Sequence, residues 1–299
     1  MSFATQVKAE LAAVRPALPC CRKAQAYGMA QGGHAFGYAG ISLQTESAAI
    51  AALYAELLQQ VCGCGPLVRQ PPAGVRGFHL VTADPADHRR IFDTFGHTGR
   101  EVSLRLNRAN LECEQCAAAY LRGLFLSCGT VTSPERGYHL EFCVPYYNLS
   151  RDLPPLFAEC GLHVRTVRRK GDYVLYFKES EQIEDCLTFM GAVGATLELM
   201  NVKMVKDIRN KTNRVINCEN ANIGKTAAAA AAQLAAVRHI IQATGGLDAL
   251  PPELREVARL RQDNPDMSLR ELGEALDPPV SRSGVYHRIH RILAFAQEV

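Results

Sequence analysis

The pattern of apolar and polar positions gives two stretches of the chain, 22–98 and 114–192, the same plan. In the second stretch, small and apolar residues over 116–128 predict a helix, and alternation over Tyr138–Val144 predicts a half-buried strand. A helix is expected at about 150–160. The remaining elements are two strands at 162–168 and 173–177, on either side of the turn signal Lys170-Gly171-Asp172, and a helix at 181–190. The order is helix, two strands, helix, two strands, helix.

The first stretch repeats this order with weak sequence identity. Its corresponding segments are 23–31, 35–44, 46–61, 67–70, 78–81 and 85–95. Strands and helices arranged in this order predict an α+β fold in which helices cover one face of each sheet. The other face is left free and is a candidate binding surface.

The end of the chain predicts an all-α unit of three helices, at 252–263, 268–276 and 282–296. Ser268 and Glu271 have the spacing of a capping box at the start of the middle helix. The middle and last helices each carry one apolar stripe at helical spacing. The connection between them, 277–280, is too short for a full antiparallel pairing, which favours a helix-turn-helix.

Charge changes this picture only locally. The whole chain carries a net charge of +3 and is 47% hydrophobic, which is typical of a folded protein and does not by itself indicate a nucleic-acid partner. However, 280–297 contains no acidic residue, whereas acidic residues are frequent in the two preceding helices. Cationic side chains are therefore concentrated on the helix that would enter a DNA groove.

The exposed side of that last helix supplies the predicted DNA contacts. They are Ser281, Arg282, Ser283, Tyr286, His287, Arg288, His290 and Arg291. Ser281 is the expected N-cap, and the first turn would bring Arg282 to base edges or phosphates. Arg288 and Arg291 are expected to bind phosphate. The alternative is a three-helix protein-docking module with a solvated basic face.

A second basic segment precedes this unit, in a helical stretch that begins near Asn201. Its cationic residues are Lys203, Lys206, Lys211 and Arg214. We predict a second phosphate-contacting surface here, and a solvated linker face is the alternative. The alanine run 227–232 lies in a strong helix former that extends to Thr244 and connects to the last unit.

The segment 120–129, YLRGLFLSCG, resembles the LAGLIDADG helix of homing endonucleases, and 26–33, AYGMAQGG, resembles a second copy. The resemblance implies that two such helices pack through small residues such as Gly123, and that an acidic residue near each helix end holds a divalent metal. At those positions this chain has Cys128 in one copy and Gly32 or Gly33 in the other. Since magnesium requires oxygen ligands, we expect a binding scaffold without catalytic residues. An active endonuclease is the alternative.

Four longer segments resemble the WhiA family of bacterial regulators: 120–142, 201–226, 250–276 and 278–292. The resemblance implies tandem LAGLIDADG-like αββαββα repeats that form a saddle with pseudo-twofold symmetry, followed by a helix-turn-helix domain. The expected domains are 1–108, 109–198, 199–248 and 249–299. The implied function is sequence-specific transcription regulation at double-stranded promoter DNA, linked to cell division, chromosome segregation and sporulation. A further partner of the LAGLIDADG-like domain, such as the transcription machinery or another regulator, stays open.

Eleven cysteines suggest disulfides, but the number is odd and Lys8 and Glu10 interrupt any signal peptide at the N-terminus. We therefore expect reduced thiols in a cytoplasmic, nucleoid-associated protein with no membrane partner. Cys113 and Cys116, with Cys62 and Cys64, would supply four zinc thiolates if the repeats brought them together.

We assign neither a metal site nor a cofactor from the sequence. The Cys62–Cys64 spacing is unusually tight, both pairs flank helix ends where free cysteines pack well, and the adjacent Cys20 and Cys21 are poorly spaced to bind one ion. The segment 222–226, NIGKT, is similar to the end of a phosphate-binding loop, but Glu219 replaces the glycine that such a loop requires.

Overall fold

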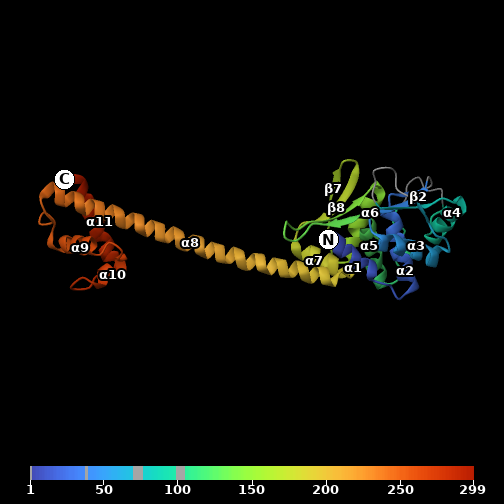
Figure 1. The fold of residues 1–299 in the computed structure, drawn as a ribbon, viewed down its shortest axis with the longest axis horizontal. Helices are drawn as coiled ribbons and strands as arrows, with labels where there is room; N and C mark the ends of the chain where they lie inside the picture. Colours follow the sequence, from blue (N-terminus) through green and yellow to red (C-terminus); the bar gives the residue numbers. More distant parts are fainter. Residues whose placement is uncertain (1, 38–39, 70–76, 99–104) are drawn as a thin grey trace. The chain divides into compact units, whose positions relative to one another are not determined.

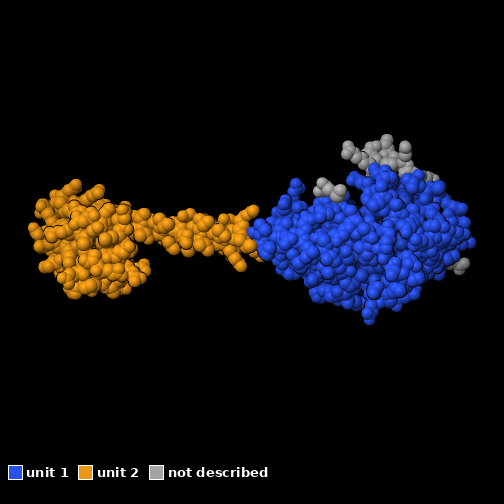
Figure 2. All heavy atoms as spheres, turned by 60° about the horizontal axis from the view of Figure 1, so that its bottom comes forward, with its two compact units in different colours: residues 1–206 blue, residues 207–299 orange. Residues whose placement is uncertain are grey.

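The computed structural model describes residues 2–37, 40–69, 77–98 and 105–299, and the chain forms two compact units (Figure 1). The N-terminal unit comprises residues 1–206 and the C-terminal unit residues 207–299 (Figure 2). Across the described ranges, no helix combines the length and apolar character needed to cross a membrane.

The N-terminal unit contains two repeats with the same order of elements. The first consists of α2 (Pro19–Gln31), β1 (Ala35–Gly37), β2 (Gly40–Thr45), α3 (Ala48–Cys62), β3 (Leu67–Arg69), β4 (Phe78–Thr82) and α4 (Pro85–Thr94). The second consists of α5 (Glu114–Cys128), β5 (Gly129–Val131), β6 (Leu140–Val144), α6 (Tyr147–Glu159), β7 (Arg165–Arg169), β8 (Asp172–Phe177) and α7 (Ser180–Met190). The predicted α+β fold with two αββαββα repeats is confirmed.

Each repeat builds a four-stranded antiparallel sheet, and the two sheets have equivalent strand orders, β1-β2-β4-β3 and β5-β6-β8-β7. The sequence placed one segment over 35–44, where the structure has β1 and β2 paired through Phe36 and Ile41. The sequence pattern did not predict β5, because this strand follows α5 without a turn signal between them. A short 3-10 helix at Arg108–Asn110 precedes the second repeat.

Helices α2 and α5 lie side by side at the centre and belong to one apolar core that includes both repeats (Figure 1). Their N-terminal ends meet at Cys21 and Cys116, and their C-terminal ends meet at Gly32 and Ser127. The two helices are therefore parallel. Glycine is required at the closest approach. A Cβ on Gly28 would lie 2.2 Å from the Tyr120 carbonyl oxygen.

An additional helix that the sequence did not predict, α1 (Phe3–Ala13), packs against this core through Val7 and Leu11. Its Glu10 carboxylate accepts hydrogen bonds from the backbone nitrogens of Gly194 and Ala195, at 2.6 and 3.0 Å. These residues open α8 (Val193–Thr244). The carboxylate thus satisfies free backbone donors at a helix N-terminus, where negative charge is favourable.

The C-terminal unit contains α9 (Pro252–Asp263), α10 (Leu269–Glu274) and α11 (Arg282–Glu298). The three predicted helices are present, and the capping box of Ser268 and Glu271 is formed. The apolar core also includes Val237 and Ile240 from the last turns of α8. The end of α8 is therefore a fourth helix in a core for which the sequence predicted three helices.

Replacing Gly123 with alanine is expected to destabilise the N-terminal unit, because the new Cβ would lie 2.2 Å from the Gln25 carbonyl oxygen. Overpacking of this kind costs about 1–3 kcal/mol, and more where backbone must move. Urea unfolding followed by circular dichroism measures the change. Gly137→Ala is the matched control, since no atom lies within 4 Å of its Cβ position. An unchanged midpoint for Gly123→Ala would contradict this close helix contact.

Candidate nucleic-acid interface

Helix α11 presents most of the predicted DNA-contacting side chains to solvent. Ser281 is the N-cap, as expected, and its hydroxyl accepts a hydrogen bond from the Gly284 nitrogen at 3.2 Å. Every member of the predicted set is exposed except Arg288, which is half-buried. Val285, Ile289 and Ile292 occupy the opposite, buried face. The apolar stripe and the basic face are therefore separated as the sequence predicted.

Three of these side chains, Tyr286, His290 and Arg291, already have side-chain partners within the unit. The guanidinium of Arg291 lies 3.3 Å from the Glu253 carboxylate on α9, which reduces the positive charge it offers to a phosphate. His290 shares a 2.9 Å hydrogen bond with the Tyr286 hydroxyl. Across the described ranges, Arg282 and Arg288 form no ion pair, so they are the freest guanidinium groups on α11.

The turn between α10 and α11 depends on a close backbone contact. The Val280 nitrogen donates to the Gly273 carbonyl oxygen at 2.9 Å, and a Cβ on Gly273 would lie 2.1 Å from the Val280 carbonyl oxygen. Only glycine fits here without displacing the turn. The contact fixes how the two helices cross, and hence how α11 is presented.

A buried arginine that sequence reasoning missed holds the segment before α10. Arg261 is 2% exposed and donates to the carbonyl oxygens of Pro265 and Met267, at 3.2 and 2.6 Å. Burial lowers the pKa of its guanidinium. Arg261 lies seven residues after Leu254 and four after Val257, on the same face of the helix, and this spacing was the available signal. Arg261 thus supports the fold and is not offered to DNA.

The second predicted basic surface is only partly free. Lys203 is paired with Glu181 and Glu184 on α7, and the Lys206 ammonium donates to the Pro134 carbonyl oxygen at 2.6 Å. Lys206 also lies 5.3 Å from the centre of the Tyr138 ring. These two lysines attach the start of α8 to the N-terminal unit, so fewer of their charges are available to phosphate than the sequence suggested. Lys211 and Arg214 are exposed.

The second sheet has a polar face opposite the one that bears Leu140 and Phe142. Strand β7 is exposed along its whole length, and its Arg169 guanidinium lies 2.8 Å from the Glu141 carboxylate. Desolvation would raise the pKa of Glu141, but hydrogen bonds from His139 and Arg169 hold it below its ordinary value. Arg165 lies on the same face, by its register opposite Tyr176. The sequence predicted a free face but not its arginines.

At the C-terminal ends of α2 and α5, the structure places the glycines and the cysteine that replace the acidic residues of the LAGLIDADG resemblance. The Cys128 thiol donates to the Leu124 carbonyl oxygen at 3.3 Å, and burial raises its pKa to about 12. The thiol is therefore neutral near pH 7. Lys8 and Glu46 line a pocket of about 590 Å³ beside these ends.

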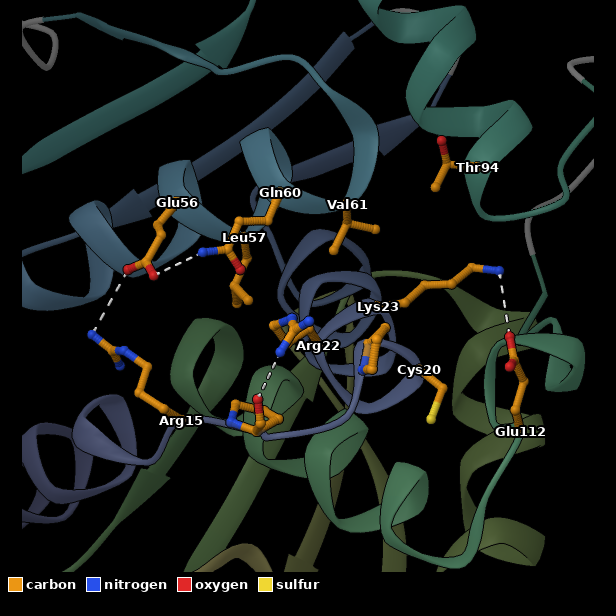
Figure 3. Close-up of a pocket in the computed structure, with 12 residues that line it drawn as sticks. Arg15, Cys20, Arg22, Lys23, Glu56, Leu57, Gln60, Val61, Thr94 and Glu112 are labelled. Atoms are coloured by element: carbon orange, nitrogen blue, oxygen red, sulfur yellow. Dashed lines mark hydrogen bonds and ion pairs between the residues drawn. The ribbon is translucent and has the colours of Figure 1, made fainter.

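A larger polar pocket, about 780 Å³, lies near the N-terminal end of α2 (Figure 3). Two ion pairs lie along it, Arg15 with Glu56 and Lys23 with Glu112, each at 3.9 Å. Cys20 lies in its wall. This pocket is distant from α11 in sequence and belongs entirely to the N-terminal unit.

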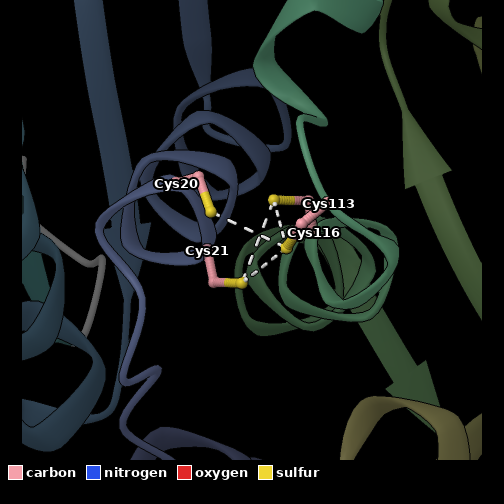
Figure 4. A group of neighbouring side chains, drawn as sticks. All are labelled: Cys20, Cys21, Cys113 and Cys116. Atoms are coloured by element: carbon pink, nitrogen blue, oxygen red, sulfur yellow. Dashed lines mark hydrogen bonds between the residues drawn. The ribbon is translucent and has the colours of Figure 1, made fainter.

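The thiols group differently from the zinc alternative considered for the sequence. Cys113 and Cys116 meet Cys20 and Cys21, and the four sulfur atoms lie within 4.8 Å of one another (Figure 4). Cys62 and Cys64 are buried elsewhere and do not join this group. The sequence does not show which residues face the adjacent pair Cys20 and Cys21 across the repeats. The NIGKT segment lies inside α8 and forms no phosphate-binding loop.

Tandem αββαββα repeats that share a central helix pair, together with a helix-turn-helix unit, define a LAGLIDADG-like protein with a DNA-binding type of domain. The model of the WhiA LAGLIDADG-like domain matches residues 117–209, and that of the WhiA C-terminal HTH domain matches residues 212–296. The chain belongs to the WhiA family.

Relatives agree with this assignment. A probable cell division protein WhiA from Desulforudis audaxviator is 38% identical over 309 residues, covering 100% of this chain and 98% of the relative. One from Clostridium botulinum is 46% identical over 198 residues, which cover 66% of this chain and only 62% of that protein. The crystal structure of full-length WhiA from Thermotoga maritima has the same fold, with a TM-score of 0.59 at 22% identity over 100% of this chain and 99% of that one.

Replacing Lys203 with methionine should change acid unfolding of the N-terminal unit. The hydrogen bond from Lys203 is the largest of several contacts that together lower the Glu181 pKa from 4.5 to about 2; the others include hydrogen bonds from the Glu181 backbone and Ser180. A carboxyl group with a lowered folded-state pKa stabilises the fold above its unfolded pKa, and this stabilisation is lost as the pH falls from 4.5 towards 2. The variant should therefore lose less stability than the wild type across that window.

Unfolding monitored by circular dichroism at several pH values measures this difference. Lys211→Met is the matched control, because Lys211 is an exposed lysine on the same helix. Its curve should follow that of the wild type. If Lys203→Met also follows the wild-type curve, the ion pair with Glu181 does not stabilise the fold.

Proposed function

We propose that this chain is a non-enzymatic, sequence-specific DNA-binding regulator of transcription whose helix α11 enters the major groove. The observation that most strongly supports this proposal is the distribution of charge in the C-terminal unit. The exposed side of α11 offers cationic and hydrogen-bonding groups and residues 280–297 include no acidic residue, whereas acidic and basic residues are mixed on α9 and α10. A phosphate backbone is therefore attracted most strongly to the exposed side of α11.

The proposed contacts have two different purposes. Arg282 and Ser283, in the first turn of α11, are suited to base edges, because recognition helices contact bases near their N-termini. Arg288 and His287 would contact phosphate and fix the register, with Arg291 contributing less because of Glu253. Tyr286 and His290 supply further polar groups to the same face.

The N-terminal unit would add affinity or a partner surface. Its open sheet carries Arg165, which is paired with Glu179, and Arg169, which is paired with Glu141, and Lys211 and Arg214 are exposed on α8. If these groups reach the same duplex as α11, the linked arrangement raises the overall affinity through effective concentration. Promoter binding in the bacterial nucleoid, with a role in cell division, chromosome segregation and sporulation, is the cellular function we infer from the family.

Cleavage is not part of the proposal. The positions that correspond to metal-binding acids are Gly32, Gly33 and Cys128, and a neutral thiol is a poor ligand for magnesium. Lys8, which lines the neighbouring pocket, places an ammonium near the region where a second cation would have to bind. The two repeats would therefore retain the scaffold of a homing endonuclease without its cleavage centre.

The double variant Arg282→Ala and Arg288→Ala, made in the full chain, is expected to lose most of its affinity for duplex DNA. Each lost phosphate contact should also make the slope of log K against log salt concentration less negative by roughly 0.9. Fluorescence anisotropy across a salt series measures both. The matched control is Arg238→Ala with Arg259→Ala, which removes the same charge from exposed positions on α8 and α9. Equal affinity of the two double variants would favour a protein-docking module.

Supercoiled plasmid incubated with the wild-type chain and Mg²⁺ or Mn²⁺ is expected to remain supercoiled, because carboxylates to assemble the metal ions are missing from the two helix ends. Gel electrophoresis detects nicked or linear products. The Arg282 and Arg288 double variant is the control, since a contaminating nuclease would act equally in both preparations. Nicking by the wild type alone, abolished by EDTA, would establish an endonuclease.

A further inference from the structure

The first turns of the two central helices bring four cysteines together. Cys20 and Cys21 lie in the first turn of α2, Cys113 is the N-cap of α5, and Cys116 lies one turn further along that helix. Each repeat contributes one pair, and the two members of each pair are neighbours at the same helix end (Figure 4). The four sulfur atoms converge in one place although nearly one hundred residues separate the pairs.

The distances between these sulfur atoms discriminate among the possible chemistries. Cys113 lies 3.6 Å from Cys20, 3.5 Å from Cys21 and 3.4 Å from Cys116, and the Cys21–Cys116 separation is 3.9 Å. A disulfide bond is only about 2.05 Å long. Four thiolates placed tetrahedrally at about 2.3 Å from one zinc ion lie about 3.8 Å apart. In a 4Fe–4S cluster the four cysteines bind four different iron atoms, and in a 2Fe–2S cluster two cysteines bind each iron, so most of the cysteine sulfur atoms lie farther apart than around one ion.

We propose that Cys20, Cys21, Cys113 and Cys116 bind one zinc ion as a tetrathiolate site that joins the two LAGLIDADG-like repeats. Four cysteine ligands leave no open position on a tetrahedral ion, so the site is structural. It also lies at the N-terminal ends of α2 and α5, whereas Gly32 and Cys128 mark the opposite ends. At a rise of 1.5 Å per residue, the length of α2 separates the cysteine site from Gly32 by about 20 Å.

The surroundings suit a site of negative charge. Four thiolates around Zn²⁺ carry a net charge of −2, and the positive ends of two helix dipoles point at them. The buried guanidinium of Arg122 interacts electrostatically with Cys21. It donates to the Met190 carbonyl oxygen at 2.8 Å, and within the described part of the chain it pairs with no carboxylate. A zinc tetrathiolate would supply the missing opposite charge.

The geometry also provides access for the ion. Cys21 and Cys116 are buried, whereas Cys20 and Cys113 are half-buried, and Cys20 lines the pocket of about 780 Å³ (Figure 3). Arg22 and Lys23 line the same pocket. Zinc would therefore enter from the Cys20 side and displace the four thiol protons, after which the site links the N-terminal ends of α2 and α5.

The test is the metal content of the full-length chain, expressed without an affinity tag and purified under reducing, oxygen-free conditions without chelator. Native mass spectrometry and elemental analysis should find one zinc ion per chain. Zinc-free protein in which Cys20, Cys21, Cys113 and Cys116 are all free to react with an alkylating reagent overturns the proposal. So does iron with inorganic sulfide, or a mass lower by two hydrogen atoms for each disulfide formed.

Variants then locate the ion. Cys20→Ser, at the half-buried edge of the site, should lose zinc to a chelator concentration that leaves the wild type loaded. Cys218→Ser, at an exposed position, and Cys62→Ser, in the pair outside the cluster, should retain zinc. Cobalt substitution gives a readout that does not depend on stability, because tetrahedral thiolate coordination has characteristic absorption bands that Cys20→Ser should shift. Retention of zinc and an unchanged spectrum in Cys20→Ser would overturn the assignment.

Removing the zinc should lower the thermal midpoint of the N-terminal unit by at least about 5 °C. The midpoint of the C-terminal unit should not change, since all four cysteines lie in the other unit. An unchanged N-terminal midpoint after complete zinc removal would show that the ion does not join the repeats.

Discussion

Direct contact between the backbones of α2 and α5 is the constraint on which the N-terminal unit depends. Gly28 and Gly123 face the other helix where a Cβ would lie 2.2 Å from a carbonyl oxygen, so no other residue permits this separation. The contact unites the cores of the two repeats and fixes their sheets relative to each other. It also sets what meets at each helix end: four thiols at one, glycines and Cys128 at the other.

The charged residues of the chain divide into those that hold the fold and those that remain available. Lys203 and Glu10 act at the start of α8, where each is engaged with backbone or side chains of the N-terminal unit. Arg261 is buried among carbonyl oxygens. Arg282 and Arg288 have no such partner in the C-terminal unit as described. Helix α11 is the candidate DNA-contacting surface because its arginines remain available to bind DNA, and not because of how many cationic residues it has.

Local signals were sufficient for most of the secondary structure. The alternation in 138–144, the capping box at Ser268 and the apolar stripes of the last two helices each lie within one short segment, and the structure bears them out. Elements without such signals were missed. Strand β5 follows α5 directly, and α1 at Phe3–Ala13 is a helix that the sequence patterns did not predict.

Residue types and periodicity within single helices and strands were enough to predict the αββαββα order, the helix-turn-helix and the acid-free stretch 280–297. The resemblance to LAGLIDADG helices implied that Gly32, Gly33 and Cys128 replace acidic residues. The pairing of Lys203 with α7, and the meeting of Cys20 and Cys21 with Cys113 and Cys116, became visible in the folded chain. Such contacts join residues far apart in sequence, and their partners are set by how the helices pack, which no local pattern encodes.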